Sequence, residues 1–213
     1  MTTRWLWASS ILVLLAGCGS VRGPATKYYK LDIPPAPAAA GPSAPASLRI
    51  EPFRTTSLLR QDRIVYCPSP TEVGFYEYHR WAEPPNDTVT KALADQLLRR
   101  RVFHSIEVSD GDEKADYVLK GSIDRLQEVD YMGGVRVQVS ISTELEDPVR
   151  HQIVWSSVAS SESVVAKSDV QAVVAAMSKA SQQSILRLTT DVAKFVQLNG
   201  LEAAASSAGT PPR

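Results

Sequence analysis

The sequence has 213 residues, of which 44% are hydrophobic and 22% charged, and its 23 basic side chains balance 23 acidic ones. This length fits one domain with short appendages, and the apolar fraction supports a packed core, which excludes a wholly disordered chain. Zero net charge argues against a general nucleic-acid-binding protein, which needs a basic face, and two cysteines with three histidines exclude a disulfide scaffold and a cysteine-rich zinc site.

The N-terminus has the pattern of a secretory signal. Arg4 precedes an apolar run at residues 5–16. As a helix this run spans about 18 Å, whereas the hydrocarbon core of a membrane is about 30 Å thick. The run is too short to cross a bilayer and is typical of the h-region of a signal peptide. It ends in Leu15-Ala16-Gly17-Cys18, which resembles the lipobox of bacterial lipoproteins.

This resemblance implies that residues 1–17 are removed and that Cys18 carries a diacylglyceryl group at the start of the mature chain. A further acyl chain on the amine makes such an anchor firm, because one chain alone binds only marginally and each buried methylene contributes ~0.8 kcal/mol. Residues 18–27 are then predicted to form a lipidated tether, and Gly19 implies sorting to the outer membrane. An ordinary signal peptide, with Cys18 incidental, is the alternative.

Short extended segments follow the tether. A strand is predicted at residues 28–31, and the proline- and alanine-rich residues 32–46 predict an extended, solvated loop outside the core. Further extended segments are predicted at residues 47–53, 63–67 and 75–81 because they are rich in β-branched and aromatic residues.

The first helix is predicted to begin after Pro84 and to run to about Arg101. Val89, Leu93 and Leu97 recur every four residues and place an apolar stripe on one face. The basic run at residues 99–101 is interpreted as the helix end, where cations interact favourably with the dipole. A patch for anionic lipids is the alternative.

The second half of the chain predicts a meander of long strands and a second helix. A strand at residues 103–108 comes first, and then apolar and polar residues alternate at residues 135–146, which predicts a strand with one buried and one wet face. Extended runs at residues 117–123 and 153–159 complete a three-stranded antiparallel meander, in which Gly121 marks a bulge or a packing site.

The second helix is predicted to be capped by Ser168, to have Asp169 in its first turn and to end at Asn199-Gly200, with residues 200–213 as a disordered tail. Together the elements predict an α+β fold, with two main helices on one face of a mostly antiparallel sheet.

No motif for catalysis or cofactor binding is evident. His79, His104 and His151 lie on separate segments without metal-ligand spacing, and the sequence has neither a phosphate-binding glycine loop nor a nucleophile motif. A protein that is not an enzyme, without metal or cofactor, is therefore expected. Cys67 has no partner once Cys18 is lipidated, so it is either a small buried side chain or, alternatively, a reactive or bridging thiol.

The segment Phe75–Trp81 is unusually aromatic, with four aromatic residues among seven. Strict alternation would place aromatic bulk on both faces of a strand, which a strand with one wet face does not require. One hypothesis is a partner-binding edge, because Tyr, Trp and Arg are favoured anchors at interfaces. Its candidate contact residues are Phe75, Tyr76, Tyr78, Arg80 and Trp81. The alternative is a core face backed by a solvated tyrosine ladder.

These residues also carry a family resemblance. The stretches Tyr28–Leu31, Asp62–Tyr66, Tyr76–Pro85 and Ala115–Gly121 resemble the ABC-type transport auxiliary lipoprotein family, in the family's order, over most of residues 28–199. The run Trp81-Ala82-Glu83-Pro84-Pro85 is the most specific, whereas Cys67 followed by proline is less familiar in the family.

The resemblance implies a compact two-layer α/β sandwich on the periplasmic face of the outer membrane of a Gram-negative bacterium. It implies a partner as well, the mammalian-cell-entry (MCE) substrate-binding component of an ABC transporter that moves lipids or other hydrophobic compounds. Some members form rings, so a homo-oligomer is possible. The alternatives are a lipid carrier that holds the cargo itself and a purely structural envelope lipoprotein.

Overall fold

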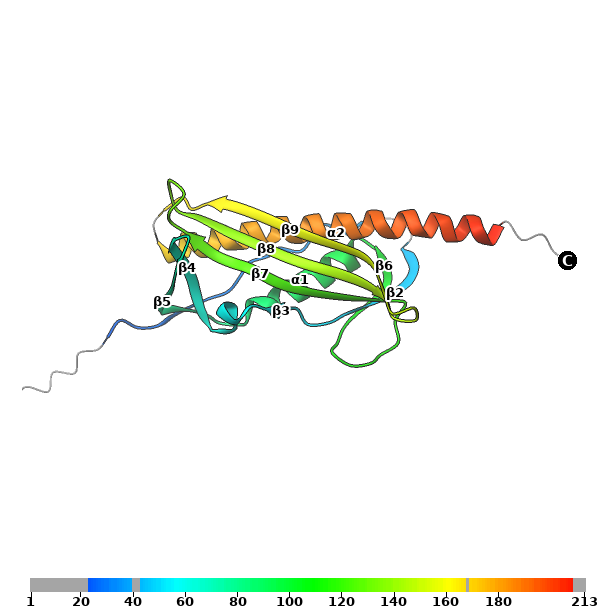
Figure 1. Cartoon of the computed structure of the whole chain (residues 1–213), viewed down its shortest axis with the longest axis horizontal. Helices are drawn as coiled ribbons and strands as arrows, with labels where there is room; N and C mark the ends of the chain where they lie inside the picture. The colour runs from blue at the N-terminus through cyan, green and yellow to red at the C-terminus, as the bar shows by residue number, and fades with distance from the viewer. Residues whose placement is uncertain (1–22, 40–42, 168, 209–213) are drawn as a thin grey trace, which may run out of the picture.

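The computed structural model describes residues 23–39, 43–167 and 169–208. It has one nine-stranded mixed sheet, two α-helices and a short 3-10 helix, η1 (Ser57–Arg60) (Figure 1). The predicted α+β class with two main helices is confirmed.

The sheet is organised around one long central strand, β7 (Tyr117–Val129). On one edge β7 pairs antiparallel with β8 (Arg136–Asp147), which pairs antiparallel with β9 (Gln152–Val164). This confirms the predicted meander. The strands extend beyond the predicted runs because backbone pairing continues where the strict alternation of side chains stops.

The other edge of β7 is occupied by three short strands placed end to end. In order along β7 they are β2 (Ala44–Ile50), β3 (Arg54–Thr55) and β4 (Arg63–Ser69), all parallel to it. The sheet is therefore mixed, and the antiparallel pairing expected for most of it is concentrated in the meander and in the hairpin that β4 forms with β5 (Glu72–Trp81). The three short strands run in the same direction, so each must pair with β7 in the same sense.

Three further strands complete the sheet. β5 (Glu72–Trp81) pairs antiparallel with β4, and β1 (Lys27–Tyr29) pairs parallel with β5. At the other end of the sheet, β6 (Phe103–Val108) pairs parallel with β2 and has the predicted bounds.

The first helix, α1 (Pro85–Arg99), begins and ends close to the predicted positions. Its last turn is basic, as the helix-end interpretation of residues 99–101 requires: Arg99 pairs with Asp95 at 2.7 Å, and Arg100 donates to the Thr190 hydroxyl at 3.3 Å. The second of these contacts joins α1 to the second helix, α2 (Val170–Ala208), and both helices lie on one side of the meander (Figure 1).

The second helix, α2, spans Val170–Ala208. Ser168, the predicted cap, lies outside the described residues; the carboxylate of Asp169 accepts the Ala172 N–H at 2.8 Å and so caps the first turn. The predicted end at Asn199-Gly200 is wrong, because the helix continues to Ala208. A glycine inside a helix costs only about 1 kcal/mol relative to alanine, and the following residues include the alanines 203–205, the best helix formers.

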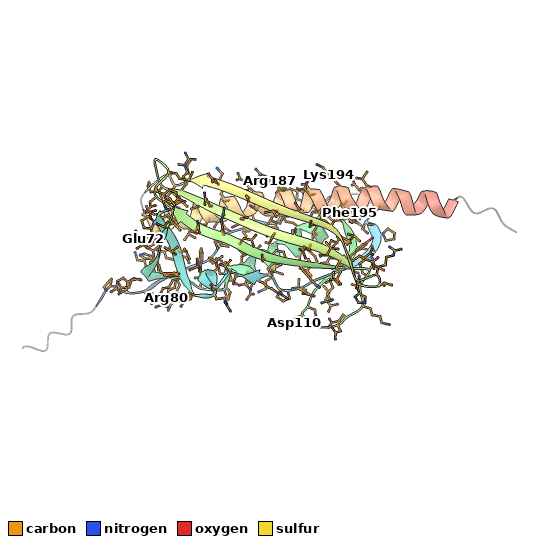
Figure 2. The ribbon with its side chains drawn as sticks, viewed as in Figure 1. Glu72, Arg80, Asp110, Arg187, Lys194 and Phe195 are labelled. Atoms are coloured by element: carbon orange, nitrogen blue, oxygen red, sulfur yellow. The ribbon has the colours of Figure 1, made fainter. Side chains whose placement is uncertain are left out.

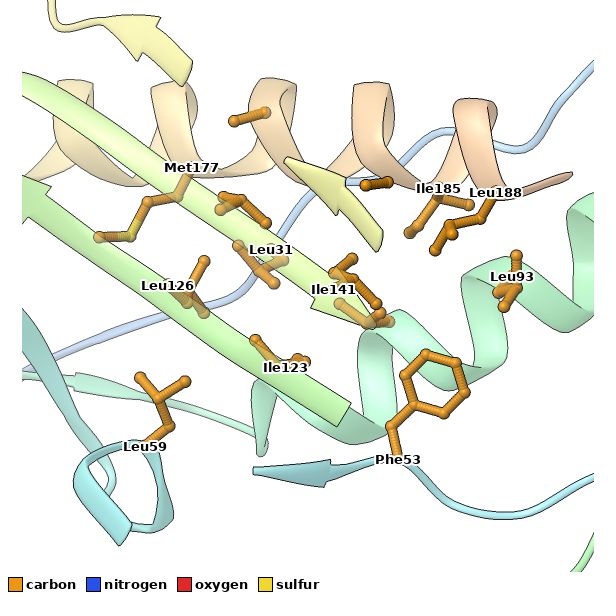
Figure 3. Close-up of a cluster of buried hydrophobic side chains, with 14 of the residues drawn as sticks. Leu31, Phe53, Leu59, Leu93, Ile123, Leu126, Ile141, Met177, Ile185 and Leu188 are labelled. Atoms are coloured by element: carbon orange, nitrogen blue, oxygen red, sulfur yellow. The ribbon is translucent and has the colours of Figure 1, made fainter. Parts of the chain in front are cut away.

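The core lies between the helices and the inward face of the sheet (Figure 3). The apolar positions of the predicted alternation in β8, among them Val137, Ile141 and Leu145, are fully buried. Met177, Ile185 and Leu188 of α2 pack in the same cluster. The stripe on α2 is thus a core stripe, and it fills the helix-facing side of the meander.

The predicted loop at residues 32–46 is too long by its last three residues, because β2 already begins at Ala44. The pairing of β2 with β6 shifts register between Ala44 and Ser47, an interval that contains Pro45. A proline is accepted in a strand at such an irregularity because no ladder hydrogen bond is required from its nitrogen.

Gly121 is a packing site. The ring of Phe53, itself only 2% exposed, lies against it, and a Cβ added at this position would come within 2.5 Å of that ring. The register shift in β7 falls later, between Ile123 and Arg125. Of the two roles considered for Gly121, packing is the one observed.

We expect Gly121→Ala to destabilise the domain by about 1–3 kcal/mol, because the buried Phe53 ring must shift to make room. Thermal unfolding followed by circular dichroism measures this as a lowered melting temperature, partly restored by adding Phe53→Leu. Gly23→Ala is the control, since no atom lies within 4 Å of its added Cβ. Equal melting temperatures for the two variants would contradict the packing role.

Candidate partner-binding surface

The aromatic segment forms most of β5, and strict alternation does not describe it. Val65 pairs with Phe75, but Arg63 pairs with Arg80, so β5 has extra residues in this interval. The irregularity rotates the side chains relative to an ideal strand. Aromatic groups on both faces of β5 therefore find neighbours within the domain.

Of the five candidate contact residues, Trp81 belongs to the core, and Phe75 and Tyr76 pack against it. Trp81 is 5% exposed and lies in the hydrophobic cluster, and the half-buried Phe75 packs against it. Trp81 cannot be a surface contact in this conformation, which corrects the sequence-based expectation. The hydrophobic energy of a large indole favours its burial wherever the sheet provides room.

Tyr76 is held by a buried carboxyl group. Its hydroxyl donates to Oε2 of Glu128 on β7 at 2.8 Å, and Glu128 is only 4% exposed. Burial is the main reason that the pKa of Glu128 is raised to about 7, and the neighbouring Asp130 raises it further. Burial and the Glu128 carboxylate also raise the pKa of the Tyr76 phenol.

A chain of ring contacts extends from this pair to the first strand. The ring centroids of Tyr66 and Tyr76 are 5.1 Å apart, and those of Tyr76 and His79 are 5.6 Å apart. His79 in turn lies 5.6 Å from Tyr29, whose hydroxyl is 2.9 Å from Nδ1 of the histidine. This aromatic cluster joins β4, β5 and β1.

The remaining candidates, Tyr78 and Arg80, are half-buried and are not part of the core cluster. The Arg80 guanidinium pairs with the Asp62 carboxylate at 2.7 Å. Tyr28, opposite Arg80 in the β1–β5 register, is 65% exposed. We call Tyr28, Tyr78 and Arg80 the β5 edge surface. Tyr28 was missed as a contact candidate because sequence reasoning did not pair its strand with β5.

A hollow of about 420 Å³ lies beside this surface. Leu59, Trp81 and Pro84 supply apolar walls, while Asp62 and Glu83 supply carboxylates. Residues 81–85, the most specific part of the family resemblance, line it directly. Apolar walls next to carboxylates suit a protein segment that carries both apolar and basic side chains.

A larger hollow, about 640 Å³, lies on the meander and is lined mainly by polar side chains, including Lys120, Ser142, Thr143 and Glu144. Hydroxyls on this face bond to one another across the strands, as between Ser140 and Ser160 at 3.1 Å. This polar lining does not suit a lipid tail.

Cys67 is 6% exposed, so the interpretation as a small buried side chain is confirmed. Burial, followed by the charge of Asp130, raises the pKa of its thiol. The thiolate is the reactive form, so both effects disfavour reactivity.

Within the part of the chain that the structure describes, no three His, Cys, Asp or Glu side chains are grouped as metal ligands. None of the helices in that part is both long enough and apolar enough to span a membrane. Cys18, the predicted lipidation site, lies outside the described residues.

Comparison with known proteins decides the family. The sequence model of the family described as "ABC-type transport auxiliary lipoprotein component" matches residues 29–189. The chain belongs to this family. The family is an auxiliary component of ABC-type transport and is not known as a class of enzymes, and its lipoprotein character suggests a membrane-anchored location in the cell envelope.

Solved structures support the fold. A Xanthomonas campestris protein matches with a TM-score of 0.69 at 17% identity, covering 84% of this chain and 99% of that one. A protein described as uncharacterized matches with a TM-score of 0.61 at 16% identity, covering 79% of this chain and 99% of that one. A Helicobacter pylori homolog of a neuraminyllactose-binding hemagglutinin matches with a TM-score of 0.51 at 12% identity, covering 84% of this chain and 100% of that one. A search of the curated proteins gives no match.

We expect Glu128→Gln to change how the stability of the auxiliary domain depends on pH. The folded-state pKa of about 7 lies above the unfolded value, so the folded state holds the extra proton between pH ~4.5 and ~7. Stability from this group is therefore greatest below that interval and falls as pH rises through it, by on the order of 2–3 kcal/mol. The glutamine variant should lack this fall.

Urea unfolding between pH 5 and pH 8 measures the difference. Glu77→Gln, which changes an exposed glutamate of β5 next to Tyr76, is the control and should keep the wild-type slope. A wild-type slope in the Glu128→Gln variant would show that this carboxyl group does not titrate in the interval.

Proposed function

We propose that this protein is a non-enzymatic auxiliary lipoprotein of an ABC transport system with an MCE-type substrate-binding component. In this proposal Cys18 anchors it to the periplasmic face of the outer membrane, and the system moves lipids or other hydrophobic compounds between the membranes. The observation that carries the proposal is a family match over residues 29–189, preceded by a lipobox that ends at Cys18.

The start of the described chain fits a lipid tether. Residues 23–28 are all exposed, and the first buried side chain is Leu31. Cys18 lies nine residues before Lys27, where β1 begins, and an extended chain of that length reaches about 30 Å. The folded domain can therefore reach a partner while the acyl chains stay in the membrane.

Cys18→Ser should abolish lipidation, because the serine hydroxyl does not replace the thiol as acceptor. In cells labelled with radioactive palmitate, the wild-type chain should incorporate label and partition into detergent, whereas the variant should do neither. Cys67→Ser is the matched control and should be labelled like the wild type. Undiminished label in the Cys18→Ser variant would refute the anchor.

The β5 edge surface and the adjoining hollow are the proposed contact with the MCE component. Tyr78 and Arg80 provide an amphipathic ring and a guanidinium at the surface, both typical of interface anchors. Phe75, Tyr76 and Trp81 would act indirectly, since their packing against the core and Glu128 fixes the course of β5.

Replacing both Tyr78 and Arg80 by alanine should reduce co-purification of the MCE component at least tenfold, because truncating central anchors typically costs more than 1 kcal/mol each. The melting temperature should change little. Co-purification from detergent-solubilised membranes provides the measurement.

The matched control replaces Val149 and Arg150 by alanine, which removes another exposed apolar side chain and another arginine ion pair, Arg150–Asp147 at 3.2 Å. Equal retention by both double variants would exclude the β5 edge surface as the contact.

The lipid-carrier alternative has less support. A carrier needs an apolar cavity of about 300–1,000 Å³. The helix-facing side of the meander is instead filled by packed side chains, and the hollow on the meander is polar. A ring of several copies, which the resemblance also implies, stays a prediction.

A further inference from the structure

Three features of the fold meet at one end of the sheet. The β4–β5 turn, at residues 70–71, lies beside the β7–β8 turn, because Cys67 pairs with Val129 and its carbonyl accepts the Asp130 N–H at 3.0 Å. The last residue of β9, Val164, pairs with Arg136 just after the β7–β8 turn. We call the end of the sheet formed by these two turns and by Val164 the tether end.

The register of β1 directs the tether toward the same end. Lys27 pairs with His79 and Tyr29 with Trp81, in parallel, so β1 runs with β5 away from the β4–β5 turn. The residues before Lys27 therefore extend back toward that turn. Figure 1 shows the N-terminal segment leaving at this end of the long axis, beside β4 and β5.

The turns at the tether end carry exposed apolar side chains. Tyr131 and Met132 on the β7–β8 turn are 41% and 46% exposed, Val73 beside the β4–β5 turn is 44% exposed, and Val164 is 68% exposed. Gly133 and Gly134 allow the β7–β8 turn, with φ of 74° and 144°. Tyr and Met are suited to the boundary between headgroups and acyl chains.

The tether end carries charges of both signs, and its two basic residues lie close to the exposed apolar side chains. Arg136 and Lys167 lie at this end together with Glu72, Asp130 and Glu162, so the acids outnumber the bases by one. Arg136 is 3.9 Å from Glu162, a loose pair that leaves the guanidinium free to meet a lipid phosphate.

The opposite end of the domain has a different character. The loop at residues 109–116 precedes β7 and contains four acidic residues and one lysine. In Figure 2 the label of Asp110, which lies in this loop, is well separated from that of Glu72 at the tether end. This end also exposes Val149, but between charged Asp147 and Arg150. An anionic lipid surface would repel the acidic loop.

We infer that the tether end lies on the lipid surface, with Tyr131, Met132, Val73 and Val164 touching the headgroup boundary. The inference rests on the proposed anchor at Cys18, only five residues before Gly23, where the described chain begins. Such a short tether gives these four side chains a high effective concentration at the membrane, so weak contacts suffice to orient the domain.

The test uses the full lipidated chain in vesicles of phosphatidylethanolamine and phosphatidylglycerol, in a Cys67→Ala background. A single environment-sensitive fluorophore is attached at a Met132→Cys or a Val149→Cys substitution. The probe at position 132 should brighten at least twofold and shift to the blue, and nitroxide groups on the lipids should quench it. The probe at position 149, the matched control, should do neither.

Vesicle flotation of the same samples separates this inference from the anchor. A chain that does not float overturns both the anchor and the orientation. A chain that floats but shows equal solvent exposure at positions 132 and 149 overturns the orientation alone. Shielding of position 132 without quenching from lipid nitroxides would indicate a second protein at this end and would also overturn the orientation.

Discussion

The pairing of β7 along both of its edges is the constraint on which the rest of the domain depends. One edge holds β8 through an antiparallel ladder, and the other holds β2, β3 and β4 in succession. Every other element is attached to this arrangement directly or through one neighbour. Gly121 lies in β7 opposite Phe53, so the same strand also determines how closely the segment between β2 and β3 can approach.

The same strand positions the candidate site, through Glu128. Its buried carboxyl group receives the Tyr76 hydroxyl and so links β7 to β5 across β4. A carboxyl group at this depth is costly when charged, and its raised pKa is the physical consequence. The aromatic cluster extends the link to β1, and Tyr78 and Arg80 remain for the surface. The β5 edge is therefore a rigid feature of the sheet, as a docking surface requires.

The sequence predicted best the parts of the fold that local periodicity determines. The alternation in residues 135–146 located β8, and the four-residue spacing of Val89, Leu93 and Leu97 located α1. It could not predict the parallel pairing of β2, β3 and β4 with β7. Strand pairing is made by backbone hydrogen bonds, and the side-chain pattern of a short strand does not specify its partner. The end of α2 was missed because a single glycine weakens a helix without stopping it.

The candidate site was predictable as a segment but not residue by residue. The concentration of aromatic residues at 75–81 singled out the segment that forms most of β5, yet the register shift against β4 determines which of these residues are exposed. Trp81 was expected at a surface and lies in the core, and Glu128 gave no sequence signal because a lone acid in a strand is usually solvated. Depth within the sheet depends on the tertiary pairing, which the local pattern does not contain.

The two proposed surfaces can operate together because they occupy different faces of the same group of strands. The turns of the tether end project along the strand direction, whereas the β5 edge surface faces sideways, beside the three-residue strand β1. A domain that rests on lipid through its turns would thus hold Tyr78 and Arg80 close to the membrane but free of it. An ABC transport partner approaching parallel to the membrane would meet this edge, while the acidic loop at residues 109–116 would extend away from the lipid. The short tether supports this geometry only because β1 and β5 are parallel; if β1 paired with β5 in the opposite sense, the chain would leave beside Trp81 and reverse the domain.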